Sequence, residues 1–250
     1  MVMKDPSGLL FDVVPHESPW FAERARSARD TRRPALAPLC LARRVITRLA
    51  VLGDSIAWGQ GATRERDRLP ARLVDGLAAR GYDAEARVFA VPGATSAGLD
   101  AQVTRALSWR PDVAVVVIGA NDLTHLIPVD RAAQALGEAV RRLRGSGTEV
   151  VVAPAPDLSA VPHVPVFLRE TVRAAGDLLR EHQRAAVLAE GGRIADPDQR
   201  ASRAFATDPS LFSADRFHPS SAGYAVIADS LLPALLEAAQ GLEIGTTPAT

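Results

Sequence analysis

The segment VLGDSIAWGQG, residues 51–61, joins an apolar run to a polar turn and contains the serine on which the interpretation of this chain depends. The mostly apolar run from Ile46 to Leu52 predicts a buried strand. Gly53, Asp54 and Ser55 follow it, where we expect the strand to turn into a helix. Ser55 then has two interpretations. It is either a helix cap, the commoner role of a lone serine at such a place, or a nucleophile held at a strand end.

Strand-like and helix-like segments alternate through the rest of the chain. This alternation predicts right-handed crossovers and a parallel sheet covered by helices on both faces. Ser96 is the expected N-cap of the second long helix. The expected strands are residues 45–53, 84–91, 112–122, 148–156 and 192–196, and the expected helices are residues 68–81, 96–109, 130–147, 168–190 and 220–239.

Unusual loops follow the first three of these strands. Ser55 comes after the first, VPGATS (residues 91–96) after the second and GAND (residues 119–122) after the third. Because the carboxyl ends of parallel strands meet at one edge of the sheet, we expect these loops to lie together and to form a site.

The segment DRFHPSS, residues 215–221, offers a base and a carboxylate three residues apart. In one tight turn, Asp215 can accept the Nδ1–H of His218 while Nε2 faces Ser55, which is the arrangement that activates a serine hydroxyl. Pro219 stiffens such a turn, and the serines after it suit the start of a helix. A lone Asp-x-x-His is more often only a loop that enters a helix.

If Ser55 attacks an acyl carbonyl, the carbonyl oxygen becomes negative and needs hydrogen-bond donors. The N–H of Ser55 at a helix start, the side-chain amide of Asn121 and the backbone N–H of Gly93 are the three candidates. Gly119 allows the backbone to bend before Asn121. Each feature alone has a simpler explanation as a turn, so the inference depends on their joint occurrence in order along the chain.

In this combination the sequence resembles the SGNH hydrolases, also called GDSL esterases and lipases. The matching blocks are Gly53-Asp54-Ser55, Gly93, Gly119 to Asp122, and Asp215 to His218. The resemblance implies a flavodoxin-like α/β fold, with three layers and a central, mostly parallel five-stranded sheet. It implies a serine esterase with Ser55 as nucleophile, His218 as general base and then acid, and Asp215 as its orienting group. The implied oxyanion hole is Ser55, Gly93 and Asn121.

The resemblance covers roughly residues 46–238, and one block departs from the family pattern. The family often has an asparagine shortly before the glycine of the second block, whereas this chain reads FAVPGATS at residues 89–96.

We expect residues 1–44 to form an extension packed on or flanking the body, with a short helix near Trp20 to Arg29. Residues 45–240 form the expected hydrolase domain, and residues 241–250 form a tail.

The sequence lacks the residues that several other functions require. The α/β-hydrolase elbow Gly-x-Ser-x-Gly fails because Ala57 occupies its last position. The five histidines show no ligand spacing, so we expect no metal and no cofactor. Three alternatives stay open: an acyltransferase, a thioesterase, and a scaffold that binds a ligand without turnover.

The formal net charge is zero, which argues against a nucleic-acid partner. Cys40 is the only cysteine, so no internal disulfide can form. We expect no secretory signal, no stretch near the roughly 20 apolar residues of a membrane span, no stable membrane insertion and a cytoplasmic protein. The oligomeric state has no sequence signal.

The expected substrate is a small ester with a short acyl group, a lipid acyl group or an acetylated sugar. Asp54, Trp58, Asp122 and His125 are candidates for its pocket because they adjoin the catalytic blocks. The loop PAPDLSAVPHVPVF, residues 154–167, either forms an apolar wall over the site or packs in the core.

Overall fold

The structure is a computed structural model that describes residues 2–4, 10–12, 44–196 and 198–245. The chain divides into two units, Met1–Leu41 and Ala42–Thr250. In the first unit, β1 (Val2–Lys4) pairs antiparallel with β2 (Leu10–Asp12). The helix expected near Trp20 to Arg29 lies outside the described residues.

The second unit is built on a parallel sheet of five strands in the order β4-β3-β5-β6-β7. The strands are β3 (Arg44–Gly53), β4 (Tyr82–Val88), β5 (Val113–Val117), β6 (Glu149–Ala153) and β7 (Arg193–Ile194). The chain first moves from β3 to β4 on one side and then crosses back to β5 on the other. The loops after β3 and β5 therefore diverge and leave a crevice between them, the usual ligand site of such sheets. The expected parallel α/β fold is confirmed.

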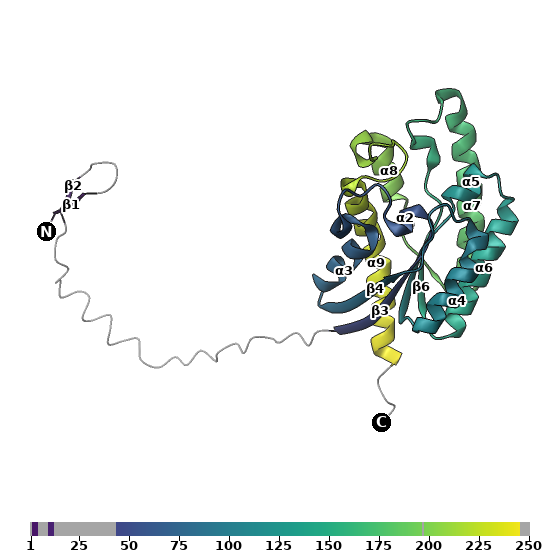
Figure 1. Ribbon diagram of the computed structural model, residues 1–250, viewed down its shortest axis with the longest axis horizontal. Coiled ribbons are helices and arrows are strands. Elements are labelled where there is room, and N and C mark those ends of the chain that lie inside the picture. The colour runs from purple at the N-terminus through teal and green to yellow at the C-terminus, as the bar shows by residue number, and fades with distance from the viewer. Residues whose placement is uncertain (1, 5–9, 13–43, 197, 246–250) are drawn as a thin grey trace. The chain divides into compact units, whose positions relative to one another are not determined.

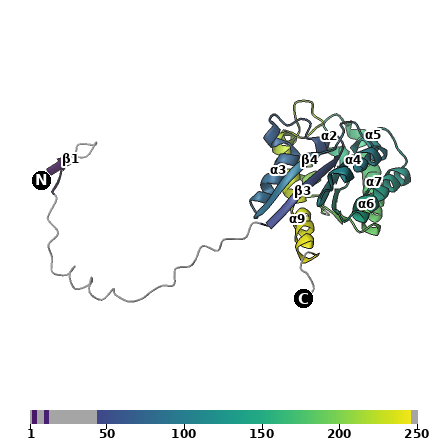
Figure 2. The ribbon, with the colours of Figure 1, turned by 60° about the horizontal axis from the view of Figure 1, so that its bottom comes forward.

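Helices cover both faces of the sheet, as Figures 1 and 2 show. The strand β3 supplies both cores by alternation, because successive side chains point to opposite faces. Leu49 and Val51 are fully buried on the face covered by α3 (Leu69–Ala78) and α9 (Ser221–Gly245). Ala50 and Leu52 pack on the other face, beneath α4 (Leu99–Trp109), α6 (Val129–Gly145) and α7 (Arg169–Ala189).

Short elements lie in the segments that connect the strands and the longer helices. The short α-helices are α2 (Ser55–Trp58), α5 (Ala120–Thr124) and α8 (Arg200–Thr207), and the 3-10 turns are η1 (Glu65–Asp67), η2 (Ser96–Gly98), η3 (Leu158–Ala160), η4 (Val166–Leu168) and η5 (Pro209–Leu211).

Ser96 is not the cap that the sequence predicts. The helix α4 begins at Leu99, after the turn η2, and its N-cap is Gly98. Ser96 is fully buried, and its hydroxyl donates to Oδ2 of Asp122 at 2.9 Å. The hydroxyl is therefore used by a carboxylate from another loop rather than by the helix.

The last helix also differs from expectation. It continues to Gly245, past the boundary that we placed at residue 240. Its stretch Ser221–Leu242 has a mean hydropathy of 1.3 and is long and apolar enough to span a membrane, contrary to the expectation that no such stretch exists. Within this structure 56% of the 18-residue window that meets this criterion is buried, and Tyr224 and Leu235 lie in the core beside α3. The apolar side of α9 thus packs as a core helix.

Candidate active site

Ser55 is the first residue of α2, directly after β3, and its hydroxyl is not the helix cap. The cap is Asp54, whose carboxylate accepts the N–H of Ile56 at 2.9 Å. The Ser55 Oγ instead lies 3.0 Å from Nε2 of His218, and Nδ1 of His218 lies 2.7 Å from Oδ2 of Asp215. Two consecutive hydrogen bonds thus join a hydroxyl, an imidazole and a carboxylate from opposite ends of the chain.

The turn of residues 213–218 holds the carboxylate in place. Oδ1 of Asp215 accepts the N–H groups of Phe217 and His218, both at 2.9 Å, and the hydroxyl of Ser213 at 2.8 Å. Arg216 takes the left-handed conformation, with φ 57°, that closes the turn. Partial burial alone raises the pKa of Asp215. The hydrogen bonds from His218, Phe217 and Ser213 outweigh it and hold that pKa well below its usual value.

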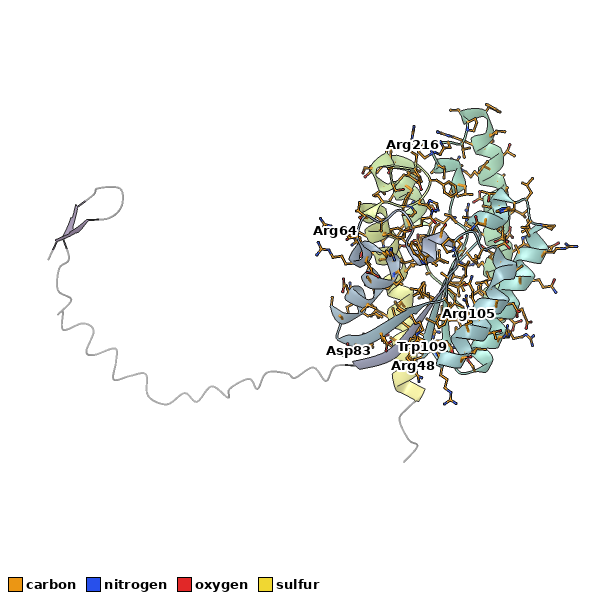
Figure 3. The ribbon with its side chains drawn as sticks, viewed as in Figure 1. Arg48, Arg64, Asp83, Arg105, Trp109 and Arg216 are labelled. Atoms are coloured by element: carbon orange, nitrogen blue, oxygen red, sulfur yellow. The ribbon has the colours of Figure 1, made fainter. Side chains whose placement is uncertain are left out.

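The lowered pKa of Asp215 determines the charge of its carboxyl. Because Asp215 stays ionised, it is an acceptor for the Nδ1–H of His218 and favours the tautomer whose Nε2 can take a proton from Ser55. Figure 3 places Arg216 at the opposite end of the sheet from Arg48, which lies in the first half of β3, so the turn stands at the carboxyl ends of the strands.

Two glycines allow the strand ends to approach each other. Gly53 has φ 131°, and a Cβ there would lie 1.8 Å from the carbonyl oxygen of Val117, which accepts the N–H of Asp54. Gly119 has φ 129°, and a Cβ there would lie 2.6 Å from Cβ of Ala155. A side chain at Gly53 would push the end of β3 away from β5, and a side chain at Gly119 would push the end of β5 away from the segment that follows β6.

The loops after β4 and β5 are joined by polar contacts. The side-chain amide of Asn121 donates to the carbonyl of Ala94 at 3.0 Å. The carboxylate of Asp122 accepts the N–H of Ser96 at 3.0 Å and its hydroxyl at 2.9 Å. Gly93 lies in the same loop with φ 81°. The structure therefore brings the loops of Gly93 and Asn121 together, and their role as oxyanion donors stays a prediction.

Two buried glutamines support this region, and we did not predict either. Gln102 of α4 is 1% exposed, and its amide accepts the N–H of Gly53 at 2.8 Å and donates to the carbonyl of Gly53 at 2.9 Å. Gln183 of α7 accepts the N–H of Ala155 at 2.8 Å and donates to the carbonyl of Ile118 at 3.3 Å. A glutamine on the otherwise apolar face of an amphipathic helix is the sequence signal that could have revealed them.

The carboxyl of Asp54 is unusual because it is buried with only one of its two oxygens hydrogen-bonded among the described residues. It is 1% exposed, and within the described part of the chain its Oδ2 has no hydrogen-bond partner. Burial raises the pKa of Asp54 to about 7; the N–H of Ile56 opposes the shift and the nearby charge of Asp122 adds to it. Asp54 is therefore mostly neutral below that pH.

A cavity of about 80 Å³ opens beside Ser55 and His218. Ser55 and His218 lie in its wall, and most of the remaining wall is apolar. The other main wall residues are Ile56, Ala120, Pro156, Leu158, Val161, Phe205, Phe212, Phe217 and Ile227.

The four residues expected in the substrate pocket are not in this wall. Asp54 and Asp122 are each 1% exposed; Oδ1 of Asp54 accepts the N–H of Ile56, and Asp122 accepts the N–H of Ser96. Trp58 packs against the core and lies 4.1 Å below the guanidinium of Arg68. His125 is exposed, with Nδ1 2.8 Å from the carbonyl of Asn121.

The apolar loop divides between the two roles considered for it. Val161 is buried and lines the cavity. Val164 packs against the apolar cluster that Val161 forms with Ala120 and Leu158. Val166 and Phe167 are 79% and 82% exposed, so they belong neither to the wall nor to the core.

In the described ranges of the chain, no three His, Cys, Asp or Glu side chains gather in a way that could hold a metal ion.

Known proteins resemble this chain in sequence and in fold. Residues 51–226 match the GDSL-like lipase/acylhydrolase family. A GDSL-like esterase of Mycobacterium tuberculosis is 39% identical over 194 residues, which are 76% of this chain and 62% of that protein's length.

Two solved structures share the fold. One, TesA, has a TM-score of 0.63 and 21% identity over 77% of this chain and 99% of its own. The other, Axe2, an acetyl xylan esterase from Geobacillus stearothermophilus, has a TM-score of 0.60 and 19% identity over 75% and 94%.

Proposed function

We propose, since this chain belongs to the GDSL-like lipase/acylhydrolase family of carboxylic ester hydrolases, that it is a serine esterase in which Ser55, His218 and Asp215 act together. The observation that carries the proposal is the pair of hydrogen bonds, 3.0 Å from Ser55 to His218 and 2.7 Å from His218 to Asp215. These are the contacts that a hydroxyl needs in order to lose its proton as it attacks.

The first half of the reaction forms an acyl-enzyme. The Oγ of Ser55 attacks the ester carbonyl, and Nε2 of His218 takes the hydroxyl proton. Asp215 stabilises the imidazolium that forms. When the tetrahedral intermediate collapses, the carbon–oxygen bond to the alcohol breaks, and His218 gives its proton to the departing alcohol oxygen.

The second half repeats these steps with water. His218 takes a proton from water as the water oxygen attacks the acyl carbon. Ser55 leaves with that proton and the acid product is released. In both halves, the N–H groups of Ser55 and Gly93 and the amide of Asn121 would donate to the carbonyl oxygen as it becomes negative.

The test is hydrolysis of p-nitrophenyl acetate by the whole chain and by Ser55→Ala. We expect Ser55→Ala to lower kcat by at least about 10⁴-fold while circular dichroism and thermal unfolding stay unchanged. The matched control is Ser108→Ala, an exposed serine on α4, which should keep full activity. Activity that survives in Ser55→Ala would overturn the proposal.

A further inference from the structure

A second and larger cavity, of about 290 Å³, lies next to the cavity that holds Ser55. It is placed beyond the carboxyl ends of β5, β6 and β7, between α7, α8 and α9. The two cavities share one wall, so whatever occupies the first is a neighbour of the second. The shared residues are Ile56, Pro156, Ala201, Ser202 and Ile227.

The floor of the larger cavity is apolar. Val117, Ala153 and Ile194 come from the ends of three strands, and Ile227 and Leu231 come from α9. Aliphatic side chains from five positions offer no hydrogen-bond partner to a polar ligand, so the floor suits a hydrocarbon group.

Five charged residues line this cavity, and several already have partners within the protein. Arg180 pairs with Asp177 at 2.5 Å and donates to the carbonyl of Ala155 at 3.2 Å. The carboxylate of Asp196 accepts the N–H groups of Arg200 and Ala201 at the start of α8. The two remaining charged residues of the lining, Glu181 and Arg184, have opposite signs. The lining therefore carries no excess positive charge that would select an anion.

We propose that the acyl chain of the substrate runs from Ser55 through the small cavity, past Ile56 and Ile227, into the larger one. This inference rests on the proposed function and names its substrate class: esters of unbranched acyl chains of medium length. Ile56 follows Ser55 directly and lines both cavities, so a chain attached to the Ser55 Oγ begins beside the shared wall. Each methylene that leaves water raises kcat/KM by up to about fourfold.

The first test uses the unaltered chain and p-nitrophenyl esters of about two to sixteen carbons. We expect kcat/KM to rise beyond the four-carbon ester and to reach its maximum at about eight to twelve carbons. A maximum at the acetate, with a decline from there, would overturn the inference and leave the esterase proposal intact. Hydrolysis of no ester at all would instead count against the esterase itself.

The second test fills the larger cavity from a position that the small cavity does not share. Ser230 lines only the larger cavity, and its hydroxyl donates to the carbonyl of Ile227 in its own helix. In Ser230→Leu we expect the ratio of kcat/KM for the ten-carbon ester to that for the acetate to fall at least about tenfold, because the added side chain occupies the path.

The matched control is Ser108→Leu, which also loses a hydroxyl bonded within its helix but lies exposed on α4. The ratio should stay at its original value there. An unchanged ratio in Ser230→Leu would overturn the inference. If Ser230→Leu does not fold, the chain-length profile of the unaltered protein decides the question alone.

Discussion

The turn of residues 213–218 and the strand ends around Gly53 and Gly119 hold the two halves of the candidate site by different means. The turn is a local device: the carboxylate of Asp215 contacts groups no more than three residues away and is partly exposed. The strand ends are buried, and contacts between distant segments, such as that from Gln102 to Gly53, fix them.

The two regions also set the charge of their carboxyls in opposite directions. In the turn, hydrogen bonds hold the pKa of Asp215 below its usual value even though partial burial opposes them. At the strand end, burial raises the pKa of Asp54 to about 7. A local turn open to water thus supplies the anion that orients His218, whereas the buried strand ends supply rigid backbone and a largely neutral carboxyl. Substitutions in the turn should therefore affect catalysis with little effect on stability, whereas at the strand ends substitutions of the buried supporting groups should affect stability and those of Ser55 and Asn121 should affect catalysis.

The largest effect is expected in the turn, from Asp215→Asn. We expect kcat to fall by about 10⁴-fold, because an amide does not stabilise the imidazolium and does not favour the productive tautomer of His218. Unfolding in urea should shift little, since the turn is near the surface. A decrease of kcat below about tenfold would show that Asp215 is not the orienting group.

The next effect is expected at the end of β5, from Asn121→Ala. Loss of one oxyanion donor lowers kcat by about 10²–10³-fold, with little change in KM. The control is Thr124→Ala on the same short helix, an exposed position whose hydroxyl contacts the carbonyl of Asn121 and Nδ1 of His125. Steady-state kinetics that gave the two variants the same kcat would remove Asn121 from the oxyanion hole.

A smaller effect on stability is expected from Gln102→Leu. The variant leaves the buried N–H of Gly53 without its acceptor, whereas the carbonyl of Gly53 keeps the N–H of Val91 at 3.0 Å. One unsatisfied buried group costs about 1–3 kcal/mol of unfolding free energy. The matched control, Gln134→Leu on the exposed side of α6, should change it by less than about 0.5 kcal/mol. Equal urea midpoints for the two variants would contradict the role given to Gln102.

A last difference is expected in the pH dependence of the unfolding free energy, from Asp54→Asn. The folded pKa of Asp54, about 7, lies above the ordinary value of 3.8 that applies when the chain is unfolded. Between these values the folded state binds more protons, so rising pH lowers the unfolding free energy by at most about 1.4 kcal/mol per pH unit. Asparagine can still cap α2 but does not titrate, so the variant should lack this slope. Parallel curves of unfolding free energy from pH 4 to 8 would contradict the raised pKa.

The local turn and the buried strand ends also differ in how well the sequence predicts their contacts. The contacts within Asp215 to His218 depend on local spacing, and the alternation of strands and helices places Ser55 at the carboxyl edge of the sheet; the sequence indicates both. The contacts of Gln102 and Gln183 join segments far apart in sequence, and no local pattern specifies their partners. Trp58 and His125 were expected in the pocket because they adjoin the blocks, but adjacency in sequence does not determine which way a side chain faces.

The measurement that tests the central claim most directly is labelling with a fluorophosphonate followed by peptide mass spectrometry. The account predicts one adduct, on the Oγ of Ser55, that forms with the native chain and is absent from Ser55→Ala and from the urea-unfolded protein. An adduct on another residue, or labelling that persists in Ser55→Ala, would contradict it.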